Sequence, residues 1–148
     1  MRPKLRVTSQ FGLICLLLPL IATLACQPAS PTPCRPTPSN SRGKLLMLQA
    51  DPNTAGVSVI LLDGKLPTAG HTTSLRWVVD SRRAGPSLML IAGQQNGTQS
   101  FQTTIREEHS SGMLTTFDSS LNFPAIGCWP TEVQSGSAEG TVTFDITN

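Results

Sequence analysis

Short apolar runs are the feature that most restricts the fold of this chain. From residue 44 onward the apolar residues do not recur at helical spacing over any long window. They fall in short runs that Gly, Pro, Asn, Asp and Ser interrupt every ~8 to 15 residues, which is typical of many short strands. The predicted strands are 44–49, 57–62, 75–80, 87–92, 99–105, 113–117, 128–134 and 141–146.

Three of these runs alternate between an apolar and a polar face. In the last run Val142, Phe144 and Ile146 share one face, and runs 75–80 and 128–133 alternate in the same way. Strands of this kind are buried on one side only. Trp77 and Trp129 fall on the apolar phase, so we expect core positions for both, the alternative being a sugar-stacking or protein-contact surface.

The length of this region indicates one domain. About 105 residues follow residue 43, the usual size of a single domain with one core. Two antiparallel sheets that pack through half-apolar strands form a sandwich. The sequence therefore predicts an all-β chain, with an immunoglobulin-like antiparallel β-sandwich of about seven or eight strands over residues 44–148.

The end of the chain carries a resemblance to a known kind of domain. The pattern begins with a proline at position 124, and Gly127-Cys128-Trp129 then opens a strand. A Gly-rich hairpin at 135–140 follows and leads into the last alternating strand. This pattern resembles the end of immunoglobulin-like domains in uncharacterised bacterial secreted proteins and lipoproteins, and 75–80 and 85–93 are similar to their central strands. The resemblance implies the fold and a cell-envelope location, and implies no activity. Pro130 departs from it, which predicts an edge strand or a bulge there.

The N-terminus predicts export. Basic residues at 2, 4 and 6 precede an apolar run at 11–22 that is too short to span ~30 Å of hydrocarbon, and small residues follow it. We expect residues 1–25 to be a signal peptide and Cys26, after Thr23-Leu24-Ala25, to be the acylated residue of a bacterial lipoprotein. The alternative is an ordinary signal peptide cut after Ala25, which would leave the protein secreted. Lipidation would place the domain on the outer side of a cell membrane.

Residues 26–43 form a polar, proline-rich segment. Pro28, Pro31, Pro33, Pro36 and Pro38 lie within it, and almost no apolar residue accompanies them. Proline at this density favours an extended, semi-rigid chain of ~3.1 Å per residue. We therefore expect a tether that joins the anchor to the sandwich and does not enter its core.

Two cysteines remain once Cys15 is removed with the signal peptide and Cys26 is acylated. An oxidising compartment would favour a disulfide between Cys34 and Cys128, which would attach the tether to the domain. The alternative is a free Cys34 in a mobile tether and a Cys128 that acts as a small buried apolar residue.

The charge of the mature chain argues against a nucleic-acid partner. The whole sequence has 11 basic and 9 acidic residues, but three of the basic ones belong to the signal peptide. No cluster of cations remains beyond Arg82-Arg83, and phosphate binding requires such clusters. Next to Asp80 and Gly85-Pro86, this pair is expected to lie in a solvated turn.

Catalytic and metal-binding patterns are absent from the sequence. It contains no Gly-x-Ser-x-Gly, His-Glu-x-x-His, Cys-x-x-Cys or Walker sequence, which predicts a protein that is not an enzyme and needs no cofactor. The one metal hypothesis combines His71, His109 and Met113 with Met89 or Cys128 as copper ligands. No two of these histidines share a ligand spacing.

Two functions stay open. The first is an interaction module that is held to the membrane by its lipid anchor and presents loops or an edge strand to another envelope protein. The second is a solute- or metal-binding lipoprotein that serves a transporter or a sensor.

Overall fold

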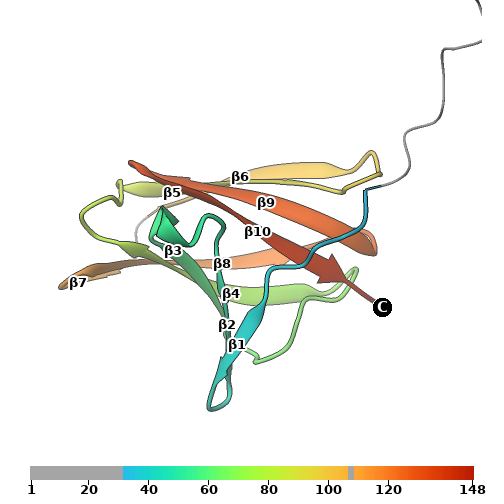
Figure 1. Ribbon diagram of the computed structural model, residues 1–148, viewed down its shortest axis with the longest axis horizontal. Helices are drawn as coiled ribbons and strands as arrows, with labels where there is room; N and C mark the ends of the chain where they lie inside the picture. The colour runs from blue at the N-terminus through green and yellow to red at the C-terminus, as the bar shows by residue number, and fades with distance from the viewer. Residues whose placement is uncertain (1–31, 107–108) are drawn as a thin grey trace, which may run out of the picture. The chain divides into compact units, whose positions relative to one another are not determined.

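Two antiparallel β-sheets face each other in the computed structural model, which describes residues 32–106 and 109–148 (Figure 1). Sheet A has six strands in the order β1 (Ser39–Arg42), β2 (Leu45–Gln49), β3 (Val57–Leu61), β4 (Thr72–Asp80), β8 (Leu114–Asn122) and β7 (His109–Ser111). Sheet B has four strands in the order β10 (Ala138–Ile146), β9 (Gly127–Ser135), β5 (Ser87–Gly93) and β6 (Ser100–Arg106). A short 3-10 helix, η1 (Asn53–Ala55), precedes β3.

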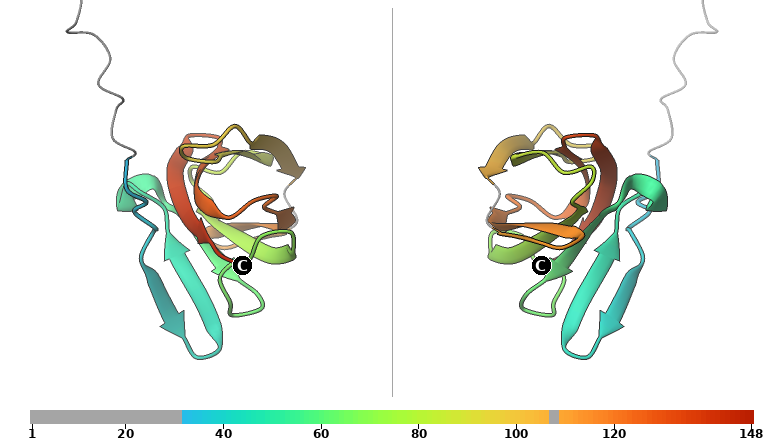
Figure 2. Two further views of the ribbon diagram at one scale, coloured as in Figure 1. Left: turned by 90° about the vertical axis from the view of Figure 1, so that its right-hand side faces the viewer. Right: turned by 90° about the vertical axis from the view of Figure 1, so that its left-hand side faces the viewer.

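The strand order is that of an immunoglobulin sandwich. Strands β3, β4, β8 and β7 lie side by side in the positions of strands A, B, E and D, and β10, β9 and β5 take the positions of G, F and C. Strand β6 adds to the C side, and the β1–β2 hairpin extends sheet A beyond β3, as Figure 2 shows. The predicted all-β sandwich is confirmed.

All eight predicted strands are present, and two further strands bring the number to ten in the described part of the chain. The additional strands, β1 and β7, are short, polar and placed at the two edges of sheet A. An edge strand is held by backbone hydrogen bonds to one neighbour, so it needs no apolar face. For this reason neither strand has a hydrophobic pattern that predicts it.

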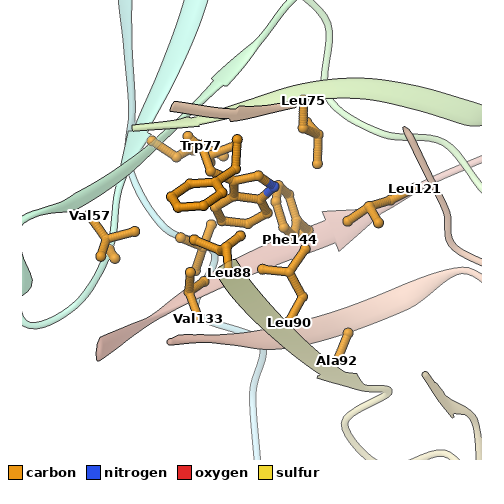
Figure 3. Close-up of a cluster of buried hydrophobic side chains, with 14 of the residues drawn as sticks. Val57, Leu75, Trp77, Leu88, Leu90, Ala92, Leu121, Val133 and Phe144 are labelled. Carbon is orange, nitrogen blue, oxygen red and sulfur yellow. The ribbon is translucent and has the colours of Figure 1, made fainter. Parts of the chain in front are cut away.

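The core lies between the inner faces of the two sheets (Figure 3). Trp77 and Trp129 are fully buried, which confirms their predicted place. Both indole N–H groups are satisfied: Trp77 donates to Ser119 Oγ at 3.0 Å, and Trp129 donates to the Ala125 carbonyl at 3.0 Å. A buried indole without an acceptor would be costly, so these two bonds fix the ring orientations.

An aromatic cluster fills one end of the core. The Phe123 ring lies at the centre of this cluster, 5.3 to 5.6 Å from its three aromatic neighbours, with two edge-to-face contacts among them. Those neighbours are Phe101, Trp129 and Phe144. Edge-to-face aromatic pairs add ~0.5 to 1.5 kcal/mol beyond the burial of their area. The cluster therefore joins β6, β9 and β10 to the β8–β9 connection.

Pro130 does not lie in an edge strand. Strand β9 is internal, paired with β10 along its whole length, and Pro130 is opposite Thr143 in that pair. On its other side β9 pairs with β5 only from Thr131, opposite Ala92, onward. Proline cannot donate a hydrogen bond, and its place just outside the β5 ladder accounts for its presence in an internal strand.

The described part of the predicted tether belongs to the sandwich, which corrects the expected boundary at residue 44. Strand β1 pairs with β2, from Ser39 opposite Leu48 to Arg42 opposite Leu45. Before it, Thr37 N–H donates to the Thr143 carbonyl at 2.9 Å. The proline-rich composition excludes this segment from the core but does not prevent pairing through its backbone. Residues 1–31, which include the predicted signal peptide and Cys26, lie outside the described residues.

Arg82 and Arg83 lie in a turn after β4, as predicted, but the Arg83 side chain is also bonded to two other loops. Its guanidinium donates to the Thr54 carbonyl at 2.6 Å and to the Ser137 carbonyl at 2.9 Å, so it links three loops at one end of the sandwich. Beside it the turn between β9 and β10 comes so close that a Cβ on Gly136 would overlap the Arg83 carbonyl oxygen. Gly136 has φ +59°, a conformation that favours glycine.

Substitution of Gly136 by alanine tests this contact. Gly112 is a matched control because its φ is also +59°, while a Cβ there would meet no atom within 4 Å. We expect Gly112→Ala to cost ~1 to 2 kcal/mol of unfolding free energy from the left-handed backbone alone. Gly136→Ala should cost at least ~1 kcal/mol more, because the chain must also move apart. Urea unfolding of both variants measures the difference, and equal losses would contradict the close approach.

Candidate binding groove on the outer face of sheet B

The outer face of sheet B carries a shallow groove that crosses three strands. Alternation along these strands turns one set of side chains away from the core and into this groove. The lining consists of Met89 and Ile91 from β5, Glu132, Val133 and Gln134 from β9, Glu139, Gly140 and Thr141 from β10, and Asp51 and Pro52 from the loop before η1. Its volume is about 260 Å³.

One wall of the groove is a loop that is fixed to the edge of the sheet. Asp51 and Thr141 exchange two backbone hydrogen bonds, of 2.9 and 2.8 Å, which attach the loop to β10. Gly140 permits this approach, because a Cβ there would lie 2.9 Å from the Ala55 side chain and 3.0 Å from that of Ala50. The wall is thus part of the fold, and the groove is formed before any partner arrives.

The charge in the groove is negative only. Asp51, Glu132 and Glu139 contribute carboxylates, and no Lys, Arg or His side chain lines the groove. Within residues 32–106 and 109–148 the ion pair of the structure is Arg76–Asp118, which is on sheet A. The three groove carboxylates therefore have no cationic partner in the described part of the protein.

The floor of the groove is apolar. Met89 and Ile91 are two residues apart on β5, so their side chains share one face, and Ile91 is 37% exposed. Ile91 stands opposite Glu132, and Met89 stands opposite Gln134. An apolar floor beneath acidic groups suits a lysine or arginine side chain, whose aliphatic stem can lie on the floor while its charged end meets the carboxylates.

The Arg76–Asp118 pair on sheet A contrasts with the groove because it is internally neutralised. Arg76 Nε and an Nη donate to the two oxygens of Asp118, each at 2.6 Å. The hydrogen bonds from this guanidinium hold the pKa of Asp118 below its ordinary value. The two charges of this pair neutralise each other, so the pair does not form a binding site comparable to the groove.

The two candidate disulfide cysteines are joined. Cys34 and Cys128 form a disulfide with their Cα atoms 5.5 Å apart. Cys128 lies on the same face of β9 as Glu132, so the bond attaches the segment before β1 to the outer face of sheet B. Gln95 Nε2 also donates to the Thr32 carbonyl at 3.0 Å, which adds a contact at the start of this segment.

The residues of the metal hypothesis are separated. His71 precedes β4 at the end where Thr72 pairs with Asn122, whereas His109 pairs with Thr116, six residues away along β8 or ~20 Å. Met89 faces out of the other sheet, and Cys128 is in the disulfide. In the described ranges no group of three His, Cys, Asp or Glu residues could hold a metal ion.

The groove itself was not predicted from the sequence. Glu132 and Glu139 lie close in sequence on the β9–β10 hairpin, whereas Asp51 is far from them in the chain and is brought beside them only by its bridge to Thr141. The alternating pattern of 128–134 places Glu132 on the outer face, which is the one indication that sequence offers. Among the residues described, no helix is long and apolar enough to cross a membrane. Comparison of the chain with family models, curated proteins and solved structures gives no match.

Removal of the disulfide should lower stability measurably. The bond closes a loop with a sequence separation of 94 residues, and disulfides typically contribute ~2 to 4 kcal/mol by restricting the unfolded chain. We expect a Cys34→Ser/Cys128→Ser double variant to lose this amount of unfolding free energy in urea. A reducing agent should lower the stability of the natural protein to that of the variant and leave the variant unchanged. Peptide mapping without reduction should recover Cys34 and Cys128 in one linked fragment, and their recovery as separate alkylated peptides would contradict the bond.

Proposed function

We propose that this protein is a lipoprotein of the bacterial cell envelope whose sandwich is a non-enzymatic interaction module. In this proposal Cys26 carries the lipid anchor, and the groove on sheet B binds a basic segment of another envelope protein. The observation that carries the proposal is the groove, which places three carboxylates without a cationic partner in the described chain around the apolar floor of Met89 and Ile91.

The shape of the groove supports a side chain or a short extended segment as its occupant. A volume of about 260 Å³ is close to the lower limit of the pockets that hold small ligands. The groove is also open rather than enclosed by the sheet face, so an occupant would keep one side in water. Carboxylates at the rim of such a site increase the rate of encounter and select the sign of the partner's charge.

The anchor hypothesis is supported by the sequence at Cys26. A small residue, Ala25, precedes the cysteine after an apolar segment. One acyl chain gives only marginal membrane binding, because each buried CH₂ contributes ~0.8 kcal/mol, whereas several chains hold a protein stably. Anchoring would keep the groove close to other proteins of the same envelope.

Replacement of Cys26 by serine tests the anchor. Without the thiol no thioether to a diacylglyceryl group can form, so the protein should move from the membrane fraction to the soluble envelope or the medium. Fractionation followed by immunoblotting measures this, with Cys34→Ser as the matched control that should stay with the membrane. If Cys26→Ser remains in the membrane fraction to the same extent as the natural protein, the lipoprotein hypothesis is wrong.

The groove is tested with an octalysine peptide as the probe. We expect octalysine to shift the backbone amide resonances of groove residues, and an octaglutamate peptide to shift none. A Glu132→Gln/Glu139→Gln variant should bind octalysine ~3- to 10-fold more weakly, since exposed charge pairs are each worth up to ~1 kcal/mol. Added salt should weaken binding to the natural protein.

The control for this test is Asp63→Asn/Asp145→Asn. Both residues are exposed and lie outside the groove, and this variant loses the same number of negative charges. We expect it to bind octalysine nearly as well as the natural protein does. Equal weakening in the two double variants would show that net charge alone attracts the peptide and would remove the groove as a site.

A further inference from the structure

Strand β10 is one of the two edge strands of sheet B, and three other segments of the chain cover it. The backbone of Asp51 bonds to Thr141, Thr37 N–H donates to the Thr143 carbonyl, and Ala69 N–H donates to the Thr147 carbonyl at 2.9 Å. The Thr143 N–H in turn donates to Thr37 Oγ1 at 2.8 Å. An added strand would find few free groups along β10. The edges of sheet A offer little more, since β1 has four residues and β7 has three.

Strand β6, the other edge of sheet B, is not covered in this way. It pairs with β5 alone, from Ser87 opposite Arg106 to Gly93 opposite Ser100. Figure 1 shows it at the outer margin of its sheet. Seven residues make it the longest uncovered edge among the described strands.

The direction of the free backbone groups follows from the turn before β6. Gln94 N–H donates to the Gln99 carbonyl at 2.8 Å, so the backbone of Gln99 faces β5. Backbone groups alternate in direction along a strand. The N–H and C=O groups of Ser100, Gln102 and Thr104 therefore point away from β5, and they have no backbone partner in the described chain.

The composition of β6 does not protect this edge. Natural sheets commonly protect an edge with lysine, proline or a bulge. From Ser100 to Ile105 the strand has no charged residue and no proline, and it is rich in the β-branched and aromatic residues that favour strands. Phe101 and Ile105 pack against the core but remain partly exposed, so a neighbouring strand would cover them further.

We propose that β6 pairs with β6 of a second copy of this chain, in antiparallel orientation about Thr103, so that two copies of sheet B form one continuous sheet. In this register Gln102 stands opposite Thr104 of the second copy, and their outward N–H and C=O groups meet as hydrogen-bonded pairs. Phe101 of each copy stands opposite Ile105 of the other, so the dimer contains two such pairs. A pair of an aromatic and a β-branched residue on neighbouring strands stabilises their association. The only charged residue of β6, Arg106, stands opposite Ser100, so no like charges meet.

The dimer is expected to be weak. One added strand contact is expected to bury less than the ~1,200 Å² of a standard stable interface, which places it among weak contacts. We therefore expect a dissociation constant between ~10 µM and ~1 mM, a range typical of weak association. The contact uses neither the groove nor Cys26. Its failure would therefore leave the function proposed above untouched, and a failure of that function would leave the dimer.

The test uses the mature chain carrying Cys26→Ser, studied by sedimentation velocity from ~10 µM to ~1 mM. We expect a concentration-dependent dimer, and hydrogen exchange at the amides of Gln102 and Thr104 that slows as the concentration rises. A chain that stays monomeric over this range would overturn the proposal. Slowed exchange confined to β1 or β7 would overturn it as well, because another edge would then form the contact.

Thr104→Pro is the variant that separates pairing from folding. It removes an N–H that points outward, so no hydrogen bond within the monomer is lost, and proline is tolerated at such edge positions. We expect the dissociation constant to rise at least tenfold, while Thr104→Val, which keeps the N–H, should change it less than ~3-fold. An unchanged dimer in Thr104→Pro would overturn the proposal.

A second variant covers the case in which Thr104→Pro fails to fold by circular dichroism. Thr104→Lys keeps the N–H but places two like charges near the symmetry axis, one from each copy. It should weaken the dimer at low salt, and added salt should partly restore it. If Thr104→Lys dimerises as the natural chain does at every salt concentration, the proposal is wrong.

Discussion

Burial of the alternating inner faces of the two sheets is the interaction on which the rest of this structure depends. Trp77 from sheet A and Trp129 from sheet B lie in that interior without exposure, in one cluster with the other buried apolar residues of the core. At ~25 cal/mol per Å² and ~200 Å² per ring, each tryptophan contributes ~5 kcal/mol before the cost of ordering the chain. Because the strands place these side chains inward, the intervening residues must point outward. The acidic groove is composed of those intervening residues, so core and groove follow from the same alternation.

The way in which each sheet edge is closed gives the domain its asymmetry. The chain before β1 and the loop before η1 bond to β10, and the segment before β4 bonds to Thr147 just after it, so one edge of sheet B is closed by the protein itself. The opposite edge has only β5 as its neighbour. Sheet B therefore has one edge fixed inside the fold and one that faces solvent. The groove lies toward the closed edge, where the Asp51 loop supplies a wall.

Much of the fold could be predicted from the sequence because the strands that form the core each carry a local apolar pattern. The eight strands with such a pattern, and the inward face of Trp129, follow from residues that are adjacent in the chain. Strands β1 and β7 carry no such pattern, because only backbone pairing holds them. The roles of Arg83 and Gly136 depend on a contact between loops more than 50 residues apart, so no local sequence pattern predicts them. The groove was missed for the same reason, since Asp51 and Glu132 meet only after the sheets have formed.

The position of the disulfide in the sequence has a consequence for the order of events during biosynthesis. A polypeptide is synthesised from its N-terminus, so Cys34 emerges 94 residues before Cys128, and all strands from β1 to β8 emerge between them. For that whole interval Cys34 is a thiol without its partner. Its thiolate can attack the disulfide of a small molecule or of an oxidoreductase, which forms a mixed disulfide and releases one thiol. The Cys34–Cys128 bond can form only after β9 has been synthesised. At that point only β10 is still missing from the sandwich. Cys34 therefore has to stay without its final partner until β9, the last strand but one, is made.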